Sequence, residues 1–183
     1  PEVPTELDVN IGFPHGGMVT VSEPRFPDEW QNLHVEPDGT IDGKYRYLFY
    51  EAETPAFTQH SAGWVVRRDE LETFFTDNLR ETGFIQPEID DFIEWWIPRL
   101  TGSEYYVIYP QYRAQLDEAI ALEFSRQPDN ILRLTYRVEA IDSPDVELTA
   151  PRIPPFQRSG FVVTEWGLIP PETMRNTTCA NAE

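Results

Sequence analysis

The sequence has one cysteine among its 183 residues, Cys179, close to the C-terminus. A single cysteine forms no disulfide within the chain and cannot supply a cysteine-based metal site. We interpret it as a free thiol in a terminal tail, the alternative being a disulfide between two chains. A chain of this length buries roughly two-thirds of its unfolded surface, so its core does not need a covalent cross-link.

Positive charge is also scarce. The chain has 14 Lys and Arg residues against 32 Asp and Glu residues, a net charge of −18, and Lys44 is its only lysine. A field of this sign repels phosphate groups, which excludes nucleic acid as a partner and disfavours anionic membranes. An acidic, lysine-poor surface is typical of proteins adapted to high salt, although a GC-rich genome also depletes lysine.

Long apolar runs are absent. No stretch approaches the ~20 apolar residues that span a bilayer, and no basic segment followed by an apolar one predicts a signal peptide. The sequence begins at Pro1 and not at Met, which indicates processing or excision from a longer chain. The sequon at Asn176 is a candidate N-glycosylation site and favours export.

Motifs for catalysis, cofactors and metals are missing too. There is no G-x-S-x-G elbow and no glycine-rich phosphate loop, so we expect no cofactor and no enzymatic activity. The three histidines, His15, His34 and His60, lack metal-binding spacing, and we interpret each as a surface or turn residue. A Ser-His-Asp arrangement of distant residues stays open. Asp38 to Gly43 lacks the ligands of a calcium loop, and two consecutive turns explain it.

The patterns that are present predict mainly β structure. Alternation of polar and apolar residues, and short apolar runs between turn signals, are typical of strands. From these patterns we predict about eight strands, arranged as a β-sandwich. The candidate segments are residues 8–11, 18–21, 33–35, 45–53, 63–67, 105–109, 119–124, 131–138 and 161–166.

A helical hairpin over residues 69–101 interrupts the strands. Asp69 is the predicted N-cap of its first helix and Gly83 the residue that ends it, while Pro87 opens the second helix. Apolar residues recur at helical spacing in both segments, so we expect the hairpin to cover one face or edge of the sandwich. The predicted domain covers residues 1–169, followed by a tail over 170–183.

Three ordered motifs resemble a widespread family of uncharacterised secreted or lipoprotein-like bacterial proteins. These are the strand YLFYEAE at 47–53, the helix DFIEWWIPRL at 91–100 and the strand GFVVTEWG at 160–167. The family pattern reads YLFWExE, DFIxYWxPxL and GFTVVEWGG, and the resemblance spans roughly residues 5–168. Because the family has no assigned activity, the resemblance implies export and fold, without chemistry.

The departures from this family pattern bear on assembly. Tyr50 stands where Trp is common and Leu168 where a second Gly is common. Of the family's opening strand, only Pro1 and Glu2 remain. If the chain starts at Pro1, the sandwich would lack one edge strand, and an unpaired edge accepts a strand from another chain.

Candidate binding residues come from two segments. Glu51 and Glu53 share one face of a strand, where paired carboxylates serve glycoside hydrolysis or bind a hard cation; an exposed, solvated face explains them equally well. Trp95 lies beside the buried stripe of its helix, where it packs within the molecule, stacks on a sugar or anchors a partner. Tyr50 is a second candidate aromatic contact.

These observations favour a structural or adhesive module outside the cell, without enzymatic activity, as the first hypothesis for function. It would associate with itself or with another surface protein, as the subunit of a surface filament joined by strand donation. The alternative is a carbohydrate- or protein-binding module that uses Trp95 and Tyr50. A hydrolase that uses Glu51 and Glu53 is the third hypothesis.

Overall fold

The computed structural model describes residues 1–26, 30–55 and 58–172, which form nine strands and three α-helices. The predicted β-rich fold with an inserted helical hairpin is confirmed. Contacts divide the chain into two compact units. Unit 1 comprises Pro1–Phe57, Arg113–Leu132 and Arg158–Val163, and unit 2 comprises Thr58–Tyr112, Arg133–Gln157 and Thr164–Glu183.

Unit 1 contains two antiparallel sheets. The first has the order β3-β1-β7, and the second is the two-stranded ribbon β2–β4. Their strands are β1 (Thr5–Gly12), β2 (Met18–Glu23), β3 (Trp30–Val35), β4 (Phe49–Glu53) and β7 (Ala121–Phe124), with the short helix α3 (Arg113–Ala119) before β7.

The core of unit 1 follows from the period of two along β1. Leu7, Val9 and Ile11 are buried while the residues between them are partly or fully exposed. Val19 from β2 and Tyr50 from β4 pack against the same core cluster. The two sheets of unit 1 therefore share one core, as the layers of a small sandwich do.

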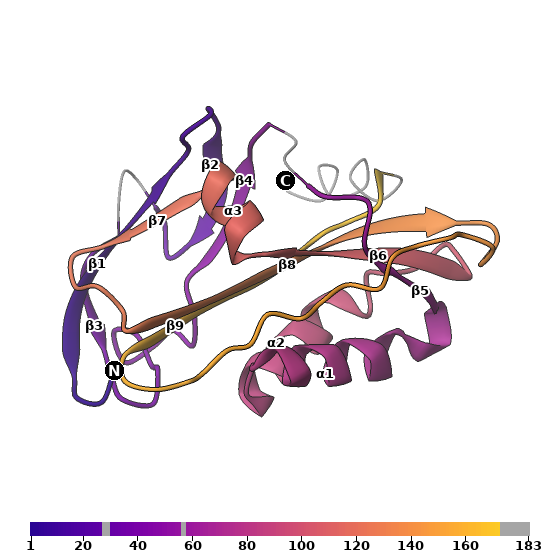
Figure 1. The fold of residues 1–183 in the computed structure, drawn as a ribbon. Coiled ribbons are helices and arrows are strands. Elements are labelled where there is room, and N and C mark those ends of the chain that lie inside the picture. The colour runs from indigo at the N-terminus through magenta and orange to yellow at the C-terminus, as the bar shows by residue number, and fades with distance from the viewer. Residues whose placement is uncertain (27–29, 56–57, 173–183) are drawn as a thin grey trace. The chain divides into compact units, whose positions relative to one another are not determined.

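Unit 2 is built on a four-stranded sheet with the order β5-β6-β8-β9. Figure 1 shows α1 and α2 side by side along one side of this sheet. None of the helices in the described part of the chain is long and apolar enough to cross a membrane. The elements are β5 (Trp64–Arg67), a 3-10 turn (Arg68–Glu70), α1 (Leu71–Thr82), α2 (Gln86–Trp96), β6 (Tyr105–Tyr112), β8 (Asn130–Ile141) and β9 (Val162–Ile169), the last two beginning in unit 1.

Aromatic rings join the helical hairpin to this sheet. Phe75 of α1 and Phe92 of α2 lie 5.0 and 5.7 Å from the Tyr136 ring of β8. Phe92 also lies 5.8 Å from Trp166 of β9. Each pair has the edge-on geometry that aromatic quadrupoles favour. The apolar stripe predicted for the hairpin thus covers one face of the sheet.

The ends of the two helices depend on local hydrogen bonds. Gly83 has φ +116° and ends α1, and its N–H reaches the carbonyls of Leu79 and Arg80, as predicted for a C′ glycine. At the start of α2, the Glu88 carboxylate accepts a hydrogen bond of 2.9 Å from the Ile85 N–H. The prediction of Asp69 as an N-cap is wrong, because it lies in the 3-10 turn and its carboxylate accepts hydrogen bonds from Arg67 instead.

The strand predicted over 45–53 is shorter than expected. β4 begins at Phe49, and Tyr45 forms an isolated bridge with Ile41. Asp42 and Gly43, both at positive φ, turn the chain back between these two residues. The second of the two tight turns predicted from Asp38 to Gly43 therefore closes on Tyr45, the first residue of the predicted strand.

Candidate functional site

A cluster of polar side chains lies on the face of the unit 2 sheet opposite the helices. Side chains alternate along β8, so Arg137 and Glu139 point away from the face that carries Tyr136. In the register of the sheet, Arg137 is the partner of Tyr109 on β6. The segment that begins at residue 58 contributes the remaining members of the cluster.

Two glutamines fix that segment against β6. The Gln111 amide is fully buried; its oxygen accepts from the Gln59 N–H at 2.7 Å and its nitrogen donates to the Gln59 carbonyl at 3.0 Å. In return, the Gln59 amide donates to the carbonyls of Ala62 and Pro110 at 2.8 and 2.9 Å. Buried amides that are fully bonded in this way hold a loop in one conformation.

Thr58, His60 and Glu139 follow one another through a hydrogen bond and an ion-pair contact. The Thr58 Oγ1 lies 3.0 Å from His60 Nε2, and His60 Nδ1 lies 3.3 Å from Glu139 Oε1. Arg137 joins both ends, because its Nη1 donates to Thr58 Oγ1 at 3.2 Å and its Nε donates to Glu139 Oε1 at 3.0 Å. The His60 ring also packs against Tyr109, at 5.4 Å between centroids. We call these four polar residues the Thr58 cluster.

One protonation pattern satisfies every bond of the Thr58 cluster. With its proton on Nδ1, neutral His60 turns its N–H toward the Glu139 carboxylate and leaves Nε2 to accept the Thr58 hydroxyl proton. The hydroxyl oxygen then accepts from Arg137. A hydroxyl, a base and an orienting carboxylate in this order have the arrangement of an activated nucleophile.

Sequence reasoning placed His60 on the surface, and its side chain is 45% exposed. The prediction missed its partners because Arg137 lies 79 positions from Thr58 in the sequence. Only the register of β8 in the folded sheet brings them together. The alternation of β8 was visible beforehand, but nothing in the sequence placed residues 58–62 over that face.

The predicted carboxylates lie on an exposed face of unit 1. Glu51 and Glu53 are both exposed, and their partners across the ribbon are Val21 and Met18. Tyr50, on the opposite face of β4, packs against the core of unit 1. In the described parts of the chain, no group of three or more His, Cys, Asp or Glu residues has the geometry to hold a metal ion.

The β2–β4 ribbon exposes apolar side chains. Met18 is 61% exposed and Val21 49% exposed. In the described structure β2 has one ladder partner, β4, and the ladder shifts register between Val19 and Val21. Its other edge is therefore available for backbone hydrogen bonds. The sequence predicts an open edge for a different reason, the loss of a strand before Pro1, and it does not single out β2.

Trp95 is 37% exposed near the end of α2. The Arg99 guanidinium lies 3.8 Å from the centre of its ring and donates a hydrogen bond to its carbonyl oxygen. This cation–π contact occupies one face of the indole and so limits its use as a stacking surface for a sugar or a partner. Asn176, the candidate glycosylation site, lies outside the described residues.

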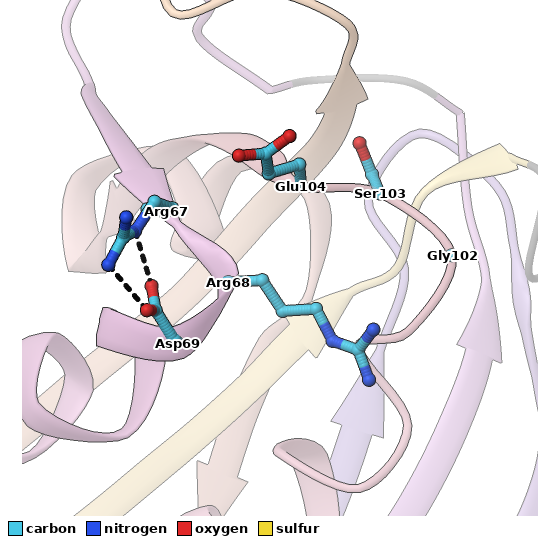
Figure 2. Close-up of a pocket in the computed structure, with 6 residues that line it drawn as sticks. All are labelled: Arg67, Arg68, Asp69, Gly102, Ser103 and Glu104. Atoms are coloured by element: carbon cyan, nitrogen blue, oxygen red, sulfur yellow. Dashed lines mark hydrogen bonds and ion pairs between the residues drawn. The ribbon is translucent and has the colours of Figure 1, made fainter.

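An open depression of about 560 Å³ lies in unit 2, between the end of β5 and the loop before β6. Figure 2 shows the six residues that line it. Arg67 and Asp69 form an ion pair at its rim, and the Ser103 hydroxyl lies 2.9 Å from the Ile141 carbonyl. Small-molecule sites are mainly apolar and enclose their ligand, and this depression is open and lined by charges. Its lining residues are Arg67, Arg68, Asp69, Gly102, Ser103 and Glu104.

Two tyrosines of the unit 2 core have strongly perturbed pKa values. Burial raises the pKa of Tyr136 well above its ordinary range, and its hydroxyl donates to the buried Asn78 side chain at 2.6 Å. Burial, and secondarily the charge of Glu81, raises the pKa of Tyr112 to about 12. Both side chains stay protonated at neutral pH, and the Tyr136 hydroxyl acts as a hydrogen-bond donor within the core.

Comparisons with known proteins place the chain in no family. No family model matches it, and no curated protein or solved structure gives a significant match. The resemblance of the three motifs to secreted bacterial proteins therefore stays a prediction.

Proposed function

We propose that this protein is a structural or adhesive module outside the cell, joined to other copies of itself by strand addition at β2. The observation that carries the proposal is the unpaired edge of β2 within the described structure, beside the exposed side chains of Met18 and Val21. Export is supported by the motif resemblance and by the sequon at Asn176. No catalytic activity is needed for this role.

The composition of β2 favours strand addition. Its sequence, MVTVSE, has β-branched residues at three of six positions and a single charge, Glu23, at its end. Natural edge strands are commonly protected by lysine, proline or inward-pointing charges. The register shift at Val19 is the one protective device on β2, whereas β4 carries both Glu51 and Glu53. β2 is thus the less protected edge of the ribbon.

A second copy of the chain is the partner that this strand fits. When two β2 strands pair antiparallel, the two Glu23 carboxylates lie at opposite ends of the new ladder, so they do not repel directly. The result is a four-stranded sheet formed by two ribbons. A symmetric β2 pair alone closes into a dimer, so a filament also requires an outer strand of the other sheet, β3 or β7.

The salt dependence of association distinguishes a second copy of the chain from a basic partner protein. Each copy has a net charge of −18, so two copies repel at low ionic strength. The Debye length falls from about 10 Å at 0.1 M salt to about 3 Å at 1 M. Association between copies should therefore strengthen as salt is added, whereas attraction to a basic partner would weaken.

Sedimentation velocity at 0.1 and 1 M NaCl, with electron microscopy of the same samples, tests the proposal. We expect concentration-dependent dimers or longer assemblies that increase with salt. Val21→Lys should reduce them, because it places a charge beside the new ladder. Val146→Lys is the matched control, since Val146 is 39% exposed and lies outside the ribbon. Discrete monomers at every concentration and salt, or equal effects of both variants, would contradict the proposal.

A further inference from the structure

We propose that the Thr58 cluster is an acyl-transfer site, in which the Thr58 hydroxyl is the nucleophile and His60 its general base. The substrate class is an activated carboxylic ester. This activity goes beyond the structural role proposed above and does not depend on it, because the cluster lies in unit 2 and the β2 edge in unit 1.

The geometry meets the requirements for an activated hydroxyl. The nucleophile lies 3.0 Å from the base, and the base lies 3.3 Å from the carboxylate that orients it. These separations are within or close to the range expected of nucleophile–base pairs before substrate binds. Glu139 is a positioning residue here: it holds the tautomer of His60 that leaves Nε2 free to accept the Thr58 proton.

Arg137 places a positive charge next to the Thr58 hydroxyl. Its Nη1 lies 3.2 Å from Thr58 Oγ1, the atom at which negative charge develops as the hydroxyl loses its proton. Its Nε is bonded to Glu139, which fixes the plane of the guanidinium. A fixed cation beside this oxygen favours transfer of the hydroxyl proton to His60.

The cluster is held in place before any substrate arrives. Arg137 and Glu139 extend from the central strand β8, and the buried amide of Gln111 fixes the backbone on which Thr58 and His60 lie. Catalytic groups keep their geometry best when rigid elements carry them. Chance contact between mobile surface side chains would not include a fully buried anchor.

The reaction needs only the ester and water. Thr58 Oγ1 attacks the ester carbonyl carbon while its proton moves to His60 Nε2. The bond between the carbonyl carbon and the leaving oxygen then breaks, the oxygen keeps the electron pair, and His60 returns the proton to it. The acyl group remains on Thr58 as an ester. A water molecule, deprotonated by His60, releases it as the carboxylic acid.

The solvent exposure of the Thr58 cluster determines which ester is suitable for the test. Because the side chains of His60 and Glu139 are 45% and 38% exposed, a small ester reaches the cluster without entering a pocket. The test uses 4-nitrophenyl acetate with the full-length protein, measuring nitrophenolate release and mapping the acetyl group by peptide mass spectrometry. Mapping the acetyl group by position separates Thr58 from the other nucleophiles of the chain, among them the Cys179 thiol and the amine of Lys44, the only lysine in the sequence.

We expect acetylation of Thr58 in the wild type and in Thr58→Ser, and none at this position in Thr58→Val. General-base catalysis contributes typically about 10²–10⁴-fold, so His60→Gln should slow acetylation at this position at least about 10²-fold. His34→Gln is the matched control, because the His34 ring also bonds a carboxylate, Glu36, at 3.2 Å, with no hydroxyl bonded to that ring in the described structure. It should leave the rate unchanged.

Glu139→Gln should slow acetylation and also change its pH profile, a readout that a purely structural role would not move. The proposal is overturned if Thr58 carries no acetyl group, or if His60→Gln and His34→Gln acetylate Thr58 at the same rate. Circular dichroism of each variant confirms that the fold is intact. Thr58→Ser keeps the test decisive, because it retains the hydroxyl with minimal change in packing.

Discussion

The buried ion pair of unit 2 gives a sharp test of the fold. The alternation along β8 places Arg133 on the side opposite its apolar residues, yet its side chain is 1% exposed and pairs with Glu165 of β9, itself 15% exposed. Arg133 Nε bonds Glu165 Oε2, and its Nη2 donates to Glu165 Oε1 at 3.2 Å. Glu165→Gln removes the charge opposite a guanidinium that cannot reach bulk water.

The expected loss follows from this burial. Removing one partner of a buried ion pair typically costs about 3–5 kcal/mol, because the remaining charge loses its compensation. A domain is stable by only about 5–15 kcal/mol in total. In a chain of this size each kcal/mol lowers Tm by about 2–4 °C, so Glu165→Gln should lower it by about 6–20 °C.

Urea unfolding followed by tryptophan fluorescence measures this loss. Asp77→Asn is the matched control within unit 2, since Asp77 pairs with Arg80 at 3.1 Å where both side chains are at least half exposed. It should change the free energy of unfolding by less than about 1 kcal/mol. Four of the five tryptophans report on unit 2: Trp64, Trp95, Trp96 and Trp166.

Two outcomes would refute the reasoning. The first is an effect of Glu165→Gln no larger than that of Asp77→Asn, which would mean that the Arg133 pair is effectively solvated. The second concerns the double variant Arg133→Met with Glu165→Leu, which removes both charges together. It should recover most of the lost stability, because an apolar pair of similar volume leaves no buried charge uncompensated. A double variant as unstable as the single one would show that the loss arises from packing.

Three further predictions concern the core of unit 2. Tyr136→Phe leaves the buried Asn78 oxygen without its donor and should lower the free energy of unfolding by about 1–3 kcal/mol in urea titrations; no change would contradict this. The pKa of Tyr112, raised to about 12, exceeds the value near 10 of an unfolded tyrosine. The folded state therefore binds this proton more tightly, so its contribution to stability is complete below about pH 10 and is lost as the pH rises through about 12. Urea midpoints measured across that range should fall more steeply in wild type than in Tyr112→Phe. Gly63→Ala places a Cβ 2.8 Å from a backbone oxygen of β6 and should lower Tm, whereas the control Gly12→Ala makes only an ordinary contact of 3.6 Å.

Much of the fold could be predicted from the sequence because the residue patterns that indicate it lie within single strands and helices. The alternation in β1 and β8, and the apolar stripes of α1 and α2, each indicate which face is buried. Gly83 predicted the end of α1 because only glycine adopts its φ without strain. Asp69 misled the prediction because Arg67, two residues earlier, competes for its carboxylate.

The burial of Arg133 could not be predicted, because it depends on a partner 32 positions away on the neighbouring strand. The same limit applies to the candidate sites. The shared exposed face of Glu51 and Glu53 follows from strand periodicity alone, and the sequence predicted it. The Thr58 cluster depends on how residues 58–62 lie over β8, which periodicity does not specify.

Hydrogen–deuterium exchange at β2 tests the central claim, self-association through this edge, most directly. The backbone amides of Met18–Glu23 that face away from β4 should exchange fast in dilute solution, since they have no ladder partner in the described structure. At high protein concentration and 1 M NaCl we predict slower exchange in this segment, with little change in the central strand β1. Exchange at β2 that does not change with concentration while the protein associates would contradict the claim.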